Sequence, residues 1–225
     1  MDKISDVPVI QATLNFVPEM LHSGGYSFQS AYNGAAQLVG LPECKLLSEH
    51  KGATGSDWVA QQIGSGVSVA CQFWLLERGL KGGTVAPSFG RKLAISGAAG
   101  ALYGGVFTPV DPADHRPAWL ARTENAAILG TSLPLMGLAG RGFQGLGRSL
   151  EASAMTGYSR TLINPVGKFL STEIGSGIAS GVPGGLWYTT GRSLAECRIP
   201  TFNETTNNLV NFSIVGGLLG ARPMR

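Results

Sequence analysis

The stretch Ile174–Ala221 contains two uncharged, glycine-rich segments on either side of a charged link. The first segment reads IGSGIASGVPGGLWYTTG (residues 174–191), the link reads RSLAECRIPTFNE (residues 192–204), and the second segment reads TTNNLVNFSIVGGLLGA (residues 205–221). A transmembrane helix needs about 20 residues, with about 17 as the lower limit. We therefore interpret the stretch as a pair of transmembrane helices.

Three further windows of the chain also lack Asp, Glu, Lys and Arg. Only 14% of the 225 residues are charged, against about 25% in ordinary soluble proteins, and 33 residues are Gly. An ionised side chain costs roughly 2.5–3.5 kcal/mol at the centre of an inserted helix, so transmembrane helices are expected in long windows without one. The five windows are residues 58–76, 93–110, 125–140, 174–191 and 205–221.

These windows predict an all-α membrane protein with about five short, glycine-rich transmembrane helices. The helices would form a bundle over residues 58–222, and residues 1–57 would form an amino-terminal extramembrane arm. The segments between the windows alternate between a basic net charge and an acidic or zero net charge, as five crossings require under the positive-inside rule. This order places the amino terminus on the outer side of the membrane. A water-soluble, glycine-rich helical bundle is the alternative.

Small residues recur three or four residues apart in four of the five windows, namely the first (Ala60, Gly64 and Ser68), second, fourth and fifth. Such spacing makes a flat stripe along a helix and lets a neighbouring backbone approach closely. We therefore predict that these glycines form helix-packing faces, although a chain so rich in glycine also produces such spacings by chance. The predicted packing residues are Gly97, Gly100, Gly104, Gly177, Gly181, Gly185, Gly216 and Gly220.

Four cations, Arg78, Lys81, Arg91 and Lys92, gather in the link after the first window. Basic residues at a membrane face bind anionic lipid headgroups, or they simply fix the orientation of the neighbouring helices. The sequence favours the second interpretation and keeps anionic lipid as a possible partner.

The sequence offers no convincing set of catalytic or metal-ligating residues. The segment GRGFQG (residues 140–145) has the form G-x-G-x-x-G, but a dinucleotide site needs a strand before it and a helix after it, and the residues before it contain Pro134. The histidines and cysteines show no metal-ligand spacing; they are His22, His50, His115, Cys44, Cys71 and Cys197. We expect no enzyme activity, no cofactor, no metal and no nucleic-acid partner.

The sequence WYTTGRSLAECR (residues 187–198), followed by TTNNLVNFSIVGGLLGAR (residues 205–222), resembles the mitochondrial inner-membrane TIM translocase channel family. That family has a glycine-rich span, a Glu-Cys near its end, and an Asn that opens the next span before a Gly-xxx-Gly and an Ala-Arg exit. The corresponding residues are Glu196, Cys197, Arg198, Asn208, Gly216, Gly220 and Arg222. The segment 200–204 departs from the family because it lacks the usual Arg-Lys-Asp run.

The resemblance implies a place in the mitochondrial inner membrane, with the amino terminus on the intermembrane-space side. Relatives in that family include a small accessory subunit of respiratory complex I, and the departure at 200–204 favours this reading. We therefore expect a non-catalytic accessory subunit that packs against other membrane subunits of a large respiratory complex. A subunit of the protein translocase is the alternative, but Gln61, Gln62 and Gln72 supply only part of the polar stripe that a channel needs.

Overall fold

The computed structural model describes residues 8–48, 55–82, 87–153 and 160–220. These residues form seven helices and one π-helical turn, with no strand among them, so the all-α part of the predicted fold is confirmed. The elements are α1 (Pro8–Val39), α2 (Gly55–Lys81), α3 (Phe89–Leu102), η1 (Tyr103–Phe107), α4 (Ala118–Ser153), α5 (Arg160–Ser171), α6 (Glu173–Ala195) and α7 (Phe202–Gly220).

The predicted membrane spans are not supported. Among the described residues, none of the helices combines the length and the apolar character that crossing a bilayer requires, so the prediction of about five transmembrane helices is wrong. The physical reason is that a window without charge is not necessarily apolar. The window 174–191, for example, contains six glycines together with Ser and Thr, and these residues add little or nothing to the transfer of a helix into lipid.

The second predicted span is also wrong in its extent. The window 93–110 does not form one helix, because α3 ends at Leu102 and continues as the π-helical turn η1, after which Thr108 is extended. The other windows lie within longer helices, namely α2, α4 and α6, and the window 205–221 matches α7 up to Gly220.

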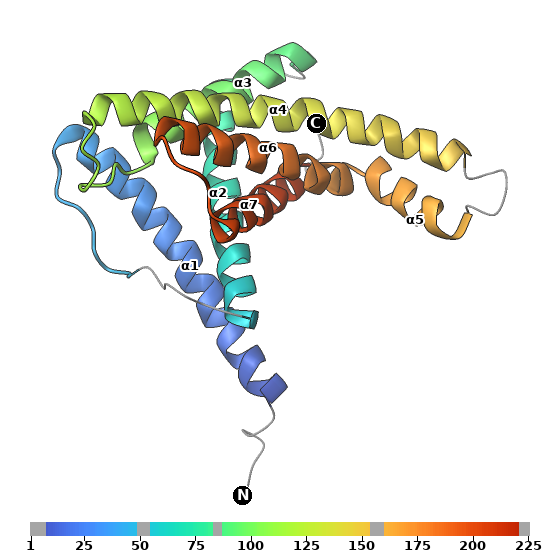
Figure 1. Ribbon diagram of the computed structural model, residues 1–225, viewed down its shortest axis with the longest axis horizontal. Coiled ribbons are helices and arrows are strands. Elements are labelled where there is room, and N and C mark those ends of the chain that lie inside the picture. The colour runs from blue at the N-terminus through green and yellow to red at the C-terminus, as the bar shows by residue number, and fades with distance from the viewer. Residues whose placement is uncertain (1–7, 49–54, 83–86, 154–159, 221–225) are drawn as a thin grey trace, which may run out of the picture.

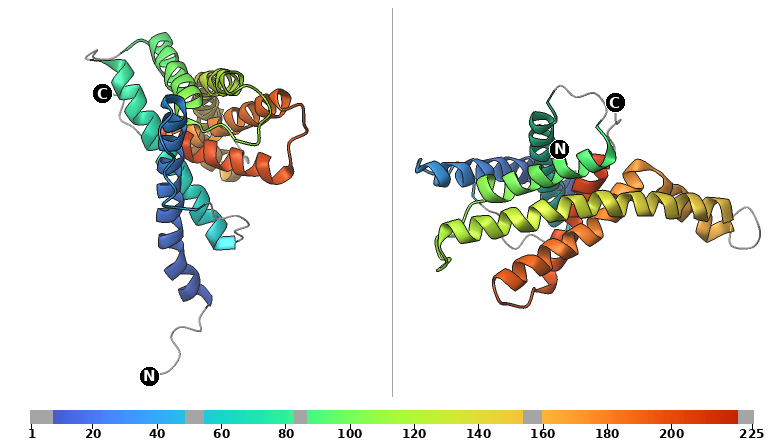
Figure 2. Two further views of the ribbon diagram at one scale, coloured as in Figure 1. Left: turned by 90° about the vertical axis from the view of Figure 1, so that its left-hand side faces the viewer. Right: turned by 90° about the horizontal axis from the view of Figure 1, so that it is seen from above.

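The long helix α4 is the axis of the molecule. It runs almost the full width of Figure 1, with α3, α5 and α6 packed along it, while α7 lies between α6 and α2. Helix α1 lies beside α2, and both extend away from α4, as the left view of Figure 2 also shows. Ser23 Oγ donates to the carbonyl of Gln61 at 2.9 Å, which ties α1 to α2. The division of the chain into an arm over residues 1–57 and a bundle stays a prediction.

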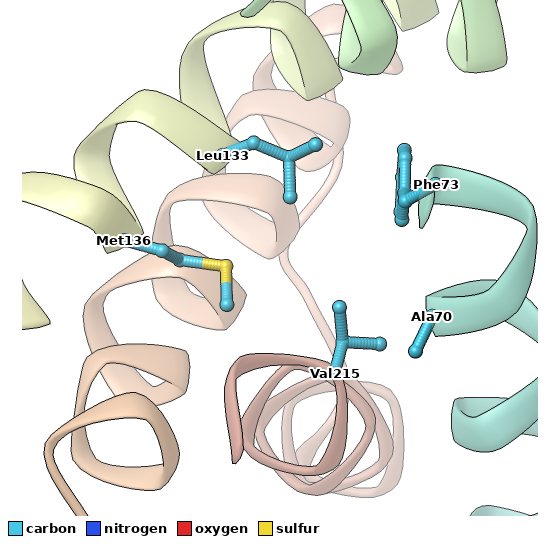
Figure 3. Packing of buried hydrophobic residues seen from close by; sticks show 5 residues of the cluster. All are labelled: Ala70, Phe73, Leu133, Met136 and Val215. Atoms are coloured by element: carbon cyan, nitrogen blue, oxygen red, sulfur yellow. The ribbon is translucent and has the colours of Figure 1, made fainter. Parts of the chain in front are cut away.

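The hydrophobic core is small. It consists of Ala70 and Phe73 from α2, Leu133 and Met136 from α4, and Val215 from α7, which point toward one another in Figure 3. The largest fully buried side chains are only Thr189, Ser132 and Ser176. With so few large side chains inside, dispersion contacts between close backbones must contribute much of the packing.

The loop between α6 and α7 is defined by a capping motif. Cys197 has a positive φ of 49°, and its N–H donates to the carbonyl of Leu194 at 3.1 Å while the N–H of Arg198 donates to that of Ser193 at 2.9 Å. This is the Schellman pattern, in which glycine usually occupies the left-handed position. The motif ends α6 and turns the chain back toward α7.

Candidate functional site: glycine crossings and a basic groove

Five of the predicted packing glycines lie where α6 crosses α7. A methyl group added to Gly177 would overlap the carbonyl of Gly216, and one added to Gly216 would overlap the carbonyl of Gly177. At Gly185 an added Cβ would lie 2.9 Å from the carbonyl oxygen of Asn208, closer than real Cβ contacts. The remaining two show the same crowding, Gly181 against Ser213 and Gly220 against Glu173. The two helices therefore touch backbone to backbone along most of α7.

The other three predicted glycines lie where α3 and η1 cross α4. An added Cβ at Gly97 would lie 3.0 Å from the carbonyl oxygen of Gly130. At Gly100 and Gly104 it would overlap the carbonyls of two further α4 residues, Leu129 and Asn125. The structure thus distributes the eight glycines between two crossings rather than along one continuous face.

Other close crossings were not predicted. A Cβ at Gly64 of α2 would overlap the carbonyl of Met20 in α1, and one at Gly34 would overlap the backbone of Phe107. A third such contact joins Gly147 of α4 to the backbone before α6. Gly34 and Gly147 lie outside the regular stripes, so spacing alone gave no signal for them, whereas Gly64 belongs to a stripe with Ala60 and Ser68.

Polar side chains connect the helices beside the α6–α7 crossing. Asn208 Nδ2 donates to Thr189 Oγ1 at 2.9 Å, and Trp58 Nε1 of α2 donates to Asn207 Oδ1 at 2.9 Å. Gln62 and Gln72 are each only 8% exposed, and the side-chain oxygen of each has no hydrogen-bond partner. Both side chains are buried between helices.

A buried cation fixes the end of α3 and η1. Arg122 of α4 is 8% exposed and donates to the carbonyl of Gly105 at 2.9 Å and to the carbonyl of Gly34 at 3.0 Å. The orphan carbonyls at the end of a helix need such donors. Arg122 therefore joins α1, η1 and α4, a role that the sequence pattern did not indicate.

An ion-pair network stabilises the charged link after α6. Arg198 forms ion pairs with Glu196 and Glu204. The hydrogen bond from Arg198 lowers the pKa of the Glu204 carboxyl. Burial acts to raise the pKa of Glu196, but hydrogen bonds from Arg192 and Arg198 outweigh it and lower the pKa below the usual value.

A second ion-pair cluster precedes α4. Hydrogen bonds from the side chain and the backbone of Arg116 lower the pKa of Asp114 to about 2. Arg116 also pairs with Glu124 at 2.6 Å and donates to the carbonyl of Ala195 at 3.1 Å. It therefore links the loop before α4 to the end of α6.

A groove of about 660 Å³ lies between α2, α3, α4, α6 and α7. Three of the four predicted lipid-binding cations, Arg78, Lys81 and Lys92, line it, and Arg141 of α4 joins them, whereas Arg91 does not line it. The sequence could not indicate Arg141, because its place in the groove depends on how α4 packs against α3.

Aromatic rings hold two of these cations at the edge of the groove. The Arg141 guanidinium carbon lies 3.5 Å from the centroid of the Phe89 ring, and that of Arg78 lies 5.5 Å from the centroid of the Trp74 ring. Such cation–π contacts are favourable.

The outer side of α6 carries an apolar stripe, which we define as Ile174, Ile178, Val182 and Leu186. These residues follow one another at four-residue spacing, and they are 51%, 37%, 44% and 45% exposed. The loop after α6 adds Ile199, at 89% exposed. Contiguous exposed apolar residues of this kind mark interaction surfaces.

The titratable residues outside these features form no metal centre in the described ranges. No group of three or more His, Cys, Asp or Glu side chains there could hold a metal ion. Cys44, Cys71 and Cys197 are free thiols. His50 lies outside the described residues.

No family model, curated protein or solved structure matches the chain. The resemblance of residues 175–222 to the TIM translocase channel family therefore stays a prediction. The function has to be inferred from the packing and the surface of this chain itself.

Proposed function

We propose that this chain is a non-catalytic structural subunit of a larger assembly, and that its α6–α7 hairpin docks against a neighbouring subunit. From the resemblance to the TIM translocase channel family, we propose that the assembly is a respiratory complex of the mitochondrial inner membrane and that the chain is an accessory subunit of it. The observation that carries the proposal is the apolar stripe of α6, which borders the glycine crossing and is left half exposed.

The hairpin has two different surfaces. Its glycine surface is occupied, because Gly177, Gly181 and Gly185 lie against the backbone of α7. Its apolar stripe is only partly covered by the described residues. Ile178 reaches over Gly217, whose added Cβ would lie 2.6 Å from Ile178 Cγ1. Backbone contact on one side makes the hairpin stiff, so the stripe is a preorganised docking surface.

The available energy is sufficient for a specific contact. Full burial of a Val, Leu or Ile side chain yields about 1.5–3 kcal/mol. Completing the burial of four side chains that are now about half exposed therefore yields roughly 3–6 kcal/mol before the costs of association. That is enough for a helix-sized contact, and a stable interface would also need flanking residues such as Ile199.

The acidic groups with lowered pKa also fit a structural role. Asp114, Glu196 and Glu204 each pair with an arginine, and their ion pairs hold loops in place. Catalytic acids and bases more often have a pKa that is shifted toward neutrality. These carboxyls are shifted the other way.

Photo-crosslinking tests the proposal directly. A photoreactive residue placed at Val182, which is 44% exposed on the stripe, should give a crosslink to a defined partner in the native assembly, while one at Leu146 of α4, which is 48% exposed, should not. Mass spectrometry of the adduct identifies the partner and so distinguishes a respiratory complex from a translocase.

Paired substitutions provide the control. Val182→Glu should release the chain from the assembly on a native gel, and Leu146→Glu, with equal charge and similar exposure, should leave it bound. The proposal fails if the chain migrates at its own 23.4 kDa before any substitution, or if both variants are released equally.

A further inference from the structure

We propose that the groove between α2, α3, α4, α6 and α7 binds a single-chain anionic lipid, with the acyl chain on the apolar floor and the head group at the basic rim. This inference concerns a different surface from the docking stripe and does not depend on the proposed function. It commits to one acyl chain with an anionic head, for which palmitate is the simplest probe.

The floor of the groove reaches the hydrophobic core. Leu133 and Met136 belong to the core cluster and also line the groove, together with Leu219 of α7. Gly140 of α4 lines it as well. An added Cβ at Gly140 would make only ordinary contacts, the nearest at 3.7 Å from Ser180 Cβ, so the missing side chain leaves space there. An acyl chain lying in that space would exchange water for apolar contacts.

The rim combines cations from three helices. Arg78 and Lys81 come from the end of α2, Lys92 from the start of α3, and Arg141 from the middle of α4. Two acids, Glu77 and Glu173, also line the groove, so the cations outnumber them by two. Glu77 already accepts a hydrogen bond from Ser96 Oγ at 2.6 Å. The surplus of positive charge selects an anionic head over a neutral or cationic one.

The arginines at the rim lie over aromatic rings. A guanidinium carries five N–H donors in one plane and pairs bidentately with carboxylate or phosphate. Arg141 lies over the Phe89 ring, with its guanidinium carbon 3.5 Å from the ring centroid. Arg141 and Phe89 both line the groove, so these donors lie where a head group at the rim would reach them.

The volume argues for one acyl chain. A groove of about 660 Å³ falls within the range of about 300–1,000 Å³ that is usual for small-molecule sites. It has room for one chain and its head group rather than for a two-chain phospholipid. An amphipathic peptide helix would need a longer, more open surface.

Displacement of the fluorescent fatty acid cis-parinarate by palmitate tests the proposal on the full chain. Arg141→Gln and Lys92→Gln should each weaken palmitate binding by about tenfold, as expected for loss of a charge-assisted hydrogen bond. Two controls, Arg91→Gln on α3 and Arg148→Gln on α4, remove the same charge outside the groove and should leave the affinity unchanged.

A second pair of variants tests the floor. Gly140→Leu puts a side chain into the groove where an added Cβ makes only ordinary contacts, at 3.7 Å from Ser180 Cβ, and Gly142→Leu adds the same side chain to open space on the same helix. The first should abolish palmitate binding and the second should preserve it. Circular dichroism spectra and melting curves that match the parent chain establish that each variant is folded.

Three results would overturn the proposal. Equal affinity for hexadecanol or hexadecyltrimethylammonium would exclude recognition of an anionic head. Binding to phosphatidylglycerol vesicles without binding of palmitate would place the affinity on a membrane surface instead. Unchanged affinity in folded Gly140→Leu would place the site outside the groove.

Discussion

The substitution Gly177→Ala should destabilise the fold, although alanine is the better helix former. A methyl group at Gly177 would overlap the carbonyl of Gly216, whereas an ordinary contact needs at least 3.4 Å. The obstacle is backbone rather than a flexible side chain, so α6 and α7 would have to move apart. Overpacking of this kind costs about 1–3 kcal/mol, and the gain in helix propensity returns about 1 kcal/mol.

We expect the overpacking cost to lie toward the upper end of its range, because the backbone cannot yield. After the gain in helix propensity is subtracted, the free energy of unfolding should fall by roughly 1–2 kcal/mol. Urea denaturation followed by circular dichroism measures it. Gly142→Ala is the matched control, since an added Cβ there meets nothing within 4 Å, and it should stabilise α4 by about 0.5–1 kcal/mol.

The double variant Gly177→Ala/Gly216→Ala sharpens the test. Each methyl group would meet the carbonyl of the other position, so one separation of the helices relieves both overlaps. The combined loss should therefore be smaller than the sum of the two single losses, as expected for residues that share a contact. Strict additivity, or a stabilising effect of Gly177→Ala as large as that of Gly142→Ala, would refute the backbone contact.

Three further predictions concern single residues. Cys197 occupies a left-handed position with φ 49°, so Cys197→Gly should raise the unfolding free energy by about 1 kcal/mol, measured by urea denaturation. Arg122→Met should lower it by about 1–3 kcal/mol, since it leaves the buried Gly34 carbonyl without its donor. The lowered pKa of Glu204 contributes stability that is present above its unfolded pKa of about 4.3 and is lost as the pH falls below it. The drop in unfolding free energy between pH 7 and pH 3 should therefore be smaller in Arg198→Gln than in the parent chain.

The helical content could be predicted from the sequence because long windows without charge or strand-forming runs leave few other structures. The glycines of the α6–α7 crossing recur four residues apart, and such residues share one face of a helix, whereas the close contacts of Gly34 and Gly147 have no such spacing. The predicted membrane crossing was wrong, because the helices of the described ranges are uncharged over long windows without being apolar enough to span a bilayer. The sequence pattern also gave no signal for the break at η1, where Tyr103 begins a π-helical turn.

The cations that line the basic groove could be predicted from the sequence only in part. Arg91 and Lys92 are neighbours in sequence, but successive residues on a helix point about 100° apart, and only Lys92 lines the groove. Arg141 lies about 50 residues further along the chain and reaches the same groove only because α4 packs on α3. A cluster of cations in the sequence therefore indicates where a basic region lies, but helix packing determines which of those cations line the groove.

A disulfide trap gives the most direct test of the glycine-mediated contact between α6 and α7. The Cβ position at Gly217 lies 2.6 Å from Ile178 Cγ1, which suits a disulfide between Ile178→Cys and Gly217→Cys in a chain whose Cys44, Cys71 and Cys197 are replaced by Ser. We predict rapid, complete loss of free thiol for this pair on mild oxidation, and retention of both thiols when Ile178→Cys is combined with Gly142→Cys on α4. Retention of free thiol in the first pair, or equal crosslinking in both, would contradict the close approach of the two helices on which the account depends.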